Sequence, residues 1–176
     1  MRKAATGFTL VEMLVVLALG AILTVLAVPS FQTLLLNRRV QVAVDALAGD
    51  LRFARAEAIK RSARVTICAS LDGATCQGAG GLWKNGWIVF VPTAASGSFT
   101  AGDEIVRVQG AMSSIDSIAA ANGTTLFQFI YEPTGWAKAA AQTFIVTPSG
   151  SASSRTLCVS NQGRPAIRAE GVTSCS

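Results

Sequence analysis

The sequence predicts an α+β fold in which one long N-terminal helix, over residues 8–62, packs against a β-rich head of residues 63–176. Three observations predict it. An apolar run leads into an amphipathic helical pattern, six β-branched or aromatic segments follow, and no helical period returns after residue 62. The length of 176 residues allows one folded domain plus one long helix, but is short for two full cores. We therefore expect the helix to cover a small antiparallel sheet or sandwich.

The composition argues against an enzyme. The chain contains no histidine, which removes Ser-His and Cys-His catalysis and nearly all catalytic zinc sites. No Ser-Lys motif accompanies its serines, and the glycine-rich Gly78–Gly81 lacks the Gly-Lys-Ser/Thr of a phosphate-binding loop. A net charge of +5 is too mild to indicate nucleic acid by itself. We expect no catalytic residue, no metal and no cofactor.

The helix begins with an apolar run over residues 8–28. At 1.5 Å rise per residue, this run is about long enough to cross a bilayer whose hydrocarbon core is roughly 30 Å thick. Arg2 and Lys3 precede the run, so the positive-inside rule keeps the N-terminus in the cytoplasm and sends the rest outward. The prediction is a single-pass membrane protein.

An ordinary secretory signal peptide is the alternative for this run. Signal peptidase could cut after Val25-Leu26-Ala27, where small and medium residues stand. Two features weigh against it: the run is longer than a usual signal-peptide core, and it carries Glu12 near its start. A carboxylate at the centre of an apolar span costs about 2.5–3.5 kcal/mol on insertion scales, so such a group usually has a partner and a function. On composition alone both interpretations stay open.

A resemblance decides between them, and it lies in residues 7–17, Gly-Phe-Thr-Leu-Val-Glu-Met-Leu-Val-Val-Leu. The segment resembles the class III signal of type IV pilins and type II secretion pseudopilins at Gly7, Phe8 and Glu12. This implies that a prepilin peptidase removes a leader of residues 1–7, cutting between Gly7 and Phe8, and N-methylates Phe8. The new amine would then pair with Glu12 of a neighbouring pilin subunit at the inner membrane, with the head in the periplasm. Pairing offsets a cost that neither charge could bear alone in the membrane.

The helix should continue beyond the membrane. Pro29 removes one amide and clashes with a carbonyl four residues back, and Gly20 weakens the helix upstream, so these positions predict a kink. Further along, Glu57 and Arg61 form a favourable i,i+4 pair, and we expect the arginines of this region to lie on a solvated face. Apolar residues at steps of three and four predict one stripe that packs on the head. Its members are Val40, Val44, Leu47, Leu51, Ala54 and Ala58.

Six strands follow the helix in this prediction. Each is rich in β-branched or aromatic residues and is bounded by Gly, Asn, Pro or Ser. We expect Trp83, Trp87 and Trp136 to pack in the core or at its rim. The predicted strands are Arg64–Ala69, Gly86–Val91, Glu104–Gln109, Thr125–Tyr131, Gln142–Pro148 and Arg155–Ser160.

The four cysteines are predicted to form two disulfides. They are Cys68, Cys76, Cys158 and Cys175, and none belongs to a C-x-x-C motif. An even count together with an export signal suggests disulfides made in an oxidising compartment. Four cysteines allow three pairings. We prefer Cys68–Cys76 and Cys158–Cys175, because each pair would close one local loop.

Four further segments, residues 54–61, 65–68, 86–90 and 103–107, resemble the GspH/FimT family of minor pilins and pseudopilins. The resemblance covers nearly the whole chain and implies a β-sandwich head on a pilin helix. The cysteines around residues 68–76 and the Cys-Val-Ser-Asn-x-Gly-Arg segment resemble members from type IV pili. The implied function is that of a structural minor pilin in pilus assembly and initiation. A minor pseudopilin of type II secretion, serving protein export, is the alternative.

The segment Gly163–Arg168 suggests a further hypothesis. It follows a turn predicted at Ser160–Gln162, which would put Arg164 and Arg168 near a loop or hairpin tip. Some minor pilins of this kind bind DNA for natural transformation through a C-terminal Gly-Arg-x-Arg. This chain matches that motif at its first two positions, has alanine at position 166, and carries its next arginine at 168. DNA is therefore a hypothetical partner, and an ordinary charged loop is the alternative.

Overall fold

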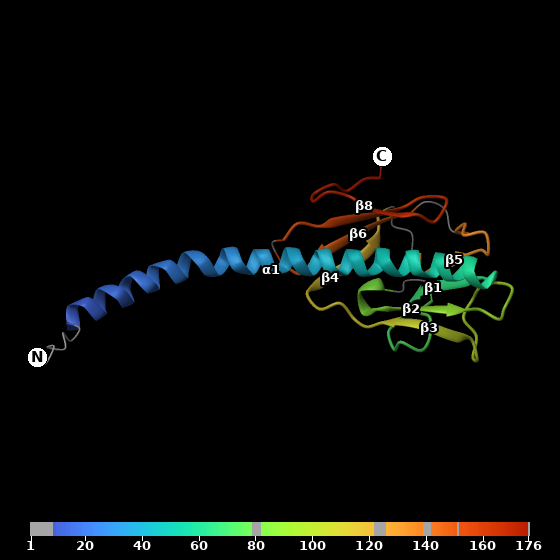
Figure 1. Ribbon diagram of the computed structural model, residues 1–176, viewed down its shortest axis with the longest axis horizontal. Helices are drawn as coiled ribbons and strands as arrows, with labels where there is room; N and C mark the ends of the chain where they lie inside the picture. Colours follow the sequence, from blue (N-terminus) through green and yellow to red (C-terminus); the bar gives the residue numbers. More distant parts are fainter. Residues whose placement is uncertain (1–8, 79–81, 122–125, 139–141, 151, 176) are drawn as a thin grey trace, which may run out of the picture. The chain divides into compact units, whose positions relative to one another are not determined.

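Figure 1 shows the computed structural model of the chain, which describes residues 9–78, 82–121, 126–138, 142–150 and 152–175. The chain divides into two units, residues 1–35 and 36–176. Within the described residues, one α-helix is followed only by strands and one short 3₁₀ helix, which confirms the predicted α+β class. The elements are α1 Leu10–Arg61, β1 Val65–Ala69, η1 Trp83–Asn85, β2 Trp87–Val91, β3 Glu104–Gln109, β4 Ile115–Ala120, β5 Gln128–Tyr131, β6 Gln142–Pro148, β7 Arg155–Val159 and β8 Pro165–Ile167.

The first unit contains the apolar beginning of α1. The most apolar window of this helix has a mean hydropathy of 2.6, and by length and composition the helix can cross a membrane. Its large apolar side chains, Leu14 and Leu23 among them, are exposed in the isolated chain. The α-helix runs without a break through Gly20 and Pro29. The kink at these two positions stays a prediction.

In the second unit, the rest of α1 packs on the head through the predicted apolar stripe. All six members of that stripe, from Val40 to Ala58, are fully buried. In Figure 1 this part of the helix lies across the strands of both sheets. One core therefore combines helix residues with Trp87 and Phe129 from one sheet and Phe144 from the other. Full burial of each large apolar side chain contributes about 1.5–3 kcal/mol, so the stripe sets where the helix attaches.

The head consists of two four-stranded antiparallel sheets among the described residues. Their strand orders are β3-β2-β1-β5 and β4-β6-β7-β8. Trp83 and Trp87 lie in the core with ring centres 6.3 Å apart, whereas Trp136 is 56% exposed. Core packing is thus confirmed for the first two tryptophans, whereas Trp136 lies outside the core.

Two of these strands, β4 and β8, are absent from the prediction. In β4 a register shift between Ile115 and Ser117 buries Ile115 and Ile118, so the inward residues are three apart rather than two. The alternation of apolar and polar residues that marks a half-buried strand is therefore missing from β4. The other strand, β8, has only three residues and begins with Pro165, which is tolerated at the first position of an edge strand.

A buried carboxylate joins α1 to the first sheet. Asp50 is 6% exposed and accepts hydrogen bonds from Trp87 Nε1 at 2.8 Å and from Arg107 Nη1 at 2.6 Å. The Arg107 guanidinium also lies over the ring of Phe53, 3.9 Å from its centre. A single side chain of the helix thereby fixes the position of α1 against β2 and β3.

Candidate functional site

The predicted assembly residue, Glu12, lies exposed in the first turn of α1. Its backbone N–H donates to Thr9 Oγ1 at 3.3 Å, so Thr9 caps the helix. Thr-x-x-Glu is the sequence signature of a capping box, and the helix dipole favours a carboxylate in the first turn. This cap could have been recognised from the sequence. Gly7 and Phe8 lie outside the described residues, so cleavage, methylation and pairing with Glu12 stay predictions.

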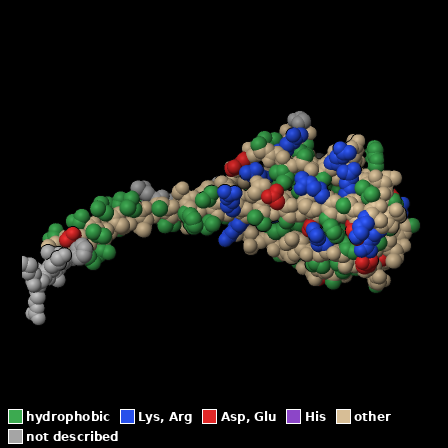
Figure 2. Space-filling view, viewed as in Figure 1, with side chains coloured by type: hydrophobic (Ala, Val, Ile, Leu, Met, Phe, Trp, Pro, Cys, Tyr) green, Lys and Arg blue, Asp and Glu red, His purple; other side chains and the backbone are tan. Residues whose placement is uncertain are grey.

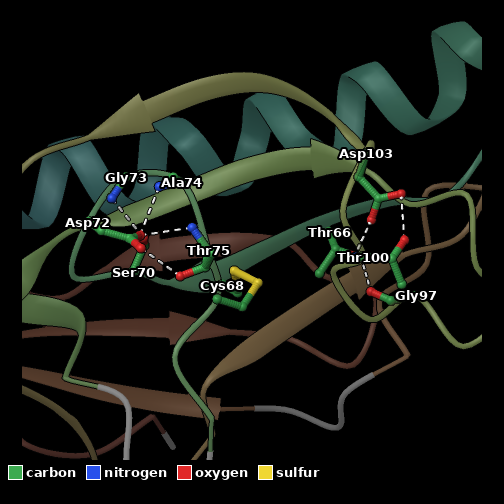
Figure 3. The surroundings of a disulfide bond; sticks show 11 residues. Thr66, Cys68, Ser70, Asp72, Gly73, Ala74, Thr75, Gly97, Thr100 and Asp103 are labelled. Atoms are coloured by element: carbon green, nitrogen blue, oxygen red, sulfur yellow. Dashed lines mark hydrogen bonds between the residues drawn. A yellow bond between two sulfur atoms is a disulfide. The ribbon is translucent and has the colours of Figure 1, made fainter.

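A disulfide between Cys68 and Cys76 closes the loop that follows β1 (Figure 3). Asp72 organises this loop by accepting hydrogen bonds from the backbone N–H groups of Ala74 and Thr75, at 2.9 and 2.8 Å, and from the Thr75 hydroxyl at 2.7 Å. These bonds favour the charged form, so the pKa of Asp72 lies well below its ordinary value. The carboxylate is committed to the loop itself.

A second carboxylate, Asp103, holds the loop between β2 and β3. It accepts hydrogen bonds from the backbone N–H and the hydroxyl of both Thr93 and Thr100. Burial raises the pKa of Asp103, but the hydrogen bonds together outweigh burial and leave this pKa below its ordinary value. The buried hydroxyl of Thr66 donates to the Gly97 carbonyl at 2.9 Å and fixes the same loop to β1 (Figure 3). Polar contacts therefore make both loops part of the scaffold.

The second disulfide, between Cys158 and Cys175, ties the C-terminal segment to β7. The Thr156 hydroxyl donates to the Val172 carbonyl and adds a second tie. The structure thus has the nearest-neighbour pairing that we prefer on sequence grounds. A cross-link closing a loop of this length contributes roughly 3 kcal/mol in the chain-entropy account.

A tight turn between β7 and β8 presents Arg164. The Gly163 N–H donates to the Ser160 carbonyl at 2.8 Å, and Gly163 has a φ of 72°. The buried hydroxyl of Tyr131 donates to the Gly163 carbonyl at 3.1 Å. Burial raises the pKa of Tyr131 well above its ordinary value, so this hydroxyl stays protonated as a donor. A glycine is needed here for its positive φ and for its close approach to the core.

Replacing Gly163 with alanine should destabilise the head and displace Arg164. The added Cβ would lie 2.5 Å from the Tyr131 ring and 3.0 Å from the Cβ of Ala137. Backbone strain together with this overpacking should lower the free energy of unfolding by about 2–3 kcal/mol. Gly171→Ala is the matched control, because Gly171 has a φ of 78° but nothing within 4 Å of a Cβ. If the thermal unfolding temperature falls equally in the two variants, the role of the Tyr131 contact is contradicted.

Arg168 does not share this turn, contrary to the expectation that both arginines lie near one tip. Three residues of β8 separate it from Arg164. At 3.3 Å per residue of strand, the two positions are about 13 Å apart. Both residues are exposed. The extended backbone of β8, which the pattern did not reveal, is the physical reason for the difference.

Arg164 instead lies beside two arginines of α1. Arg52, Arg55 and Arg164 line one open groove of about 510 Å³. In Figure 2, Lys and Arg side chains gather over this half of the helix and the neighbouring part of the head. Arg52 and Pro165 are 113 residues apart in the sequence, so no local pattern could have revealed the groove.

In the part of the chain that the structure describes, no group of three or more His, Cys, Asp or Glu side chains could hold a metal ion. Arg61 forms two ion pairs at the end of α1. The Glu57 carboxylate forms an ion pair with Arg61 Nε at 2.6 Å, as the i,i+4 spacing predicts. Arg61 Nη1 also lies 2.6 Å from the carboxylate of Glu104 on β3. These contacts tie the end of α1 to the first sheet.

Comparison with known families gives two matches, which lie in different parts of the chain. Residues 43–163 match the family described as type II transport protein GspH, and residues 2–28 match the prokaryotic N-terminal methylation motif. The chain belongs to the GspH family. No curated protein matches its sequence significantly.

Solved structures of similar fold include two crystal forms of the type IV minor pilin FimU of Pseudomonas aeruginosa strain PAO1. The form in space group P21 has a TM-score of 0.58 at 20% identity and covers 75% of this chain and 90% of FimU. The form in space group P65 has a TM-score of 0.55 at 19% identity, with 73% and 92% covered. At this identity the likeness is one of fold: a long N-terminal helix followed by antiparallel sheets.

Within the GspH family, the features of this chain have a common meaning. The methylation motif and the minor-pilin fold identify a type IV minor pilin or pseudopilin, which is a structural subunit. Membership implies assembly with other pilins and processing by a prepilin peptidase. The apolar half of α1 accordingly suits a membrane-anchored filament subunit.

Proposed function

We propose that this GspH-family chain is a minor pilin of a type IV pilus, held in the inner membrane by α1, with its head in the periplasm, until it enters the filament. The observation that carries the proposal is the methylation motif over residues 2–28, which leads into a helix long and apolar enough to span a membrane. In this proposal the Glu12 carboxylate pairs with the N-terminal amine of a neighbouring subunit. The head contributes contacts rather than catalysis.

A minor pseudopilin of type II secretion is the alternative within the same family. Two features support the pilus branch: the local Cys68–Cys76 loop and the Cys-Val-Ser-Asn-x-Gly-Arg segment that ends at Arg164 resemble pilus-associated members. Both lie in parts of the head that disulfides hold in place. Filaments sheared from cells that lack either the pilus assembly ATPase or the secretion ATPase distinguish the two branches. A pilus subunit disappears from sheared filaments only when the pilus ATPase is missing.

Processing provides the direct test of the pilin assignment. Mass spectrometry of the mature chain should find N-methylated Phe8 as its first residue, since Gly7-Phe8 precedes the apolar run. In cells without a prepilin peptidase, the chain should keep residues 1–7. A mature chain that begins at Val28 would mean ordinary signal-peptide cleavage and would overturn the proposal.

DNA binding through Arg164 and Arg168 is a second candidate function. The observation that favours it is the exposed position of both residues on the β7–β8 hairpin, where the turn is tied to the core through Tyr131. A guanidinium suits phosphate because its planar fork donates two hydrogen bonds at once. Phosphate contacts carry no base information, so such binding would not depend on DNA sequence.

Titration of the detergent-solubilised full chain with labelled duplex at low salt tests this candidate. With two phosphates neutralised, the slope of log affinity against log salt should be about −1.8. Arg164→Gln and Arg168→Gln should each weaken binding, whereas Arg38→Gln on the exposed side of α1 should not. Absence of binding at low salt, or binding unaffected by both hairpin substitutions, would contradict the candidate.

A further inference from the structure

The groove between α1 and the start of β8 combines positive charge with an apolar floor. Arg52, Arg55 and Arg164 line it together with Ala56, Ile59 and Pro165. Ala56 is exposed, and Ile59 is 49% exposed, so the floor is accessible to a partner. The groove is open rather than enclosed and has a volume of about 510 Å³.

Backbone carbonyls orient two of the three guanidiniums. Arg55 Nε donates to the Gly135 carbonyl at 2.9 Å, and Arg52 Nη2 donates to the Pro165 carbonyl at 3.4 Å. Each guanidinium has five N–H donors, so one bond to a neutral carbonyl leaves most of them available. These hydrogen bonds orient the two guanidinium groups but do not neutralise their positive charges.

Four other arginines of the second unit provide a contrast. Arg61, Arg64, Arg107 and Arg155 each have a carboxylate oxygen within 4.0 Å. Among the described residues, no such ion pair involves the three arginines of the groove. A carboxylate is therefore what the groove lacks and what its charge would complement.

The apolar floor distinguishes a protein partner from a polyphosphate. Phosphate contacts require cations and donors, but they do not require exposed Ala56 and Ile59 between them. Trp136 is 56% exposed and directly follows Gly135, whose carbonyl binds Arg55. Arginine and tryptophan together with apolar side chains are the composition of the centres of protein–protein interfaces.

We propose that this groove binds an acidic segment of a neighbouring pilin subunit. One Asp or Glu side chain of that segment pairs with Arg52 and Arg164, and an adjacent apolar side chain packs on Ala56 and Ile59. Paired guanidinium and carboxylate groups form short, directional hydrogen bonds, so the contact sets register as well as affinity. The identity of the neighbour rests on the proposed function as a filament subunit, whereas the chemistry of the groove does not.

Site-specific photo-cross-linking in the full chain, in membranes of the producing cell, tests the proposal. Benzoylphenylalanine in place of Ala56 should give an adduct with a pilin-like subunit, on a peptide that carries Asp or Glu. The same probe at Val42, which is 63% exposed on α1 but does not line the groove, should not give that adduct. Arg52→Glu combined with Arg164→Glu should reduce the adduct about tenfold. Arg38→Glu, about 21 Å along the helix from Arg52, should leave it unchanged.

Charge exchange completes the test. Reversing the identified carboxylate to Arg should restore the adduct in the doubly reversed chain. An adduct with DNA, with lipid or with a protein that is not pilin-like, or an adduct insensitive to the arginines, would overturn the proposal, as would no adduct at wild-type membrane levels. An adduct with a type II pseudopilin would support the groove while contradicting the pilus function, so the two failures are distinguishable.

Discussion

Glu12→Ala is expected to leave cleavage and membrane insertion largely intact while sharply reducing incorporation into filaments. Without the carboxylate, the amine of a neighbouring subunit would have to be buried in the apolar layer unpaired. Insertion scales give about 2.5–3.5 kcal/mol for a charge at the centre of a membrane helix, which corresponds to more than tenfold in incorporation. The measurement is the ratio of this chain in sheared filaments to this chain in membranes, with Glu12→Gln as the variant that removes charge alone.

The helix cap supplies the control for this experiment. Thr9 accepts a hydrogen bond from the Glu12 N–H, and Glu12 lies in the first helical turn, so its replacement also disturbs the start of α1. Thr9→Val removes the capping hydroxyl and keeps the carboxylate, at a cost of about 1 kcal/mol to the helix. If Thr9→Val reduces incorporation as much as Glu12→Ala, the role of Glu12 is local to the helix and the pairing proposal fails.

Asp50→Ala should cause the largest loss of stability of any substitution in the polar contacts of the head. It removes the acceptor of Trp87 Nε1 inside the core and leaves Arg107 without its ion-pair partner. An unsatisfied buried donor costs about 1–3 kcal/mol, and a broken buried ion pair about 3–5 kcal/mol. Because the Arg107 side chain is 44% exposed and water can solvate it, we expect a total near the lower figures, about 3–4 kcal/mol.

Near-UV circular dichroism of the detergent-solubilised chain during heating measures this loss, since Trp83 and Trp87 are in the core. A loss of this size corresponds to a fall in Tm of roughly 6–16 °C for a protein of this length. Asp50→Asn should fall between wild type and Asp50→Ala, because an amide oxygen still accepts from the indole. Asp45→Ala, an exposed position bonded only to Gln41 among the described side chains, is the control. Similar losses at Asp45 and Asp50 would show that the network does not stabilise the head.

The polar features of the head have different origins in the sequence. The pairing of Glu57 with Arg61 is local, and the i,i+4 spacing on one helix was sufficient to predict it. The contact between Asp50 and Arg107 joins residues 57 positions apart, and neither residue type nor spacing distinguishes this Asp50 from the exposed Asp45. Its burial depends on how the helix is rotated against β2 and β3, which is a property of the packed core.

By itself, the sequence determined the features that depend on neighbours along the chain. The apolar run beginning at Phe8, the stripe from Val40 to Ala58 and the α+β class follow from local composition and period, because membrane insertion and helix amphipathicity are set by consecutive residues. Only the tertiary structure decided the pairing of β4 with β6 and of β8 with β7, the approach of Gly163 to Tyr131, and the meeting of Arg52 and Arg55 with Arg164. These depend on strand register and on packing between distant segments, which one-dimensional periodicity does not record.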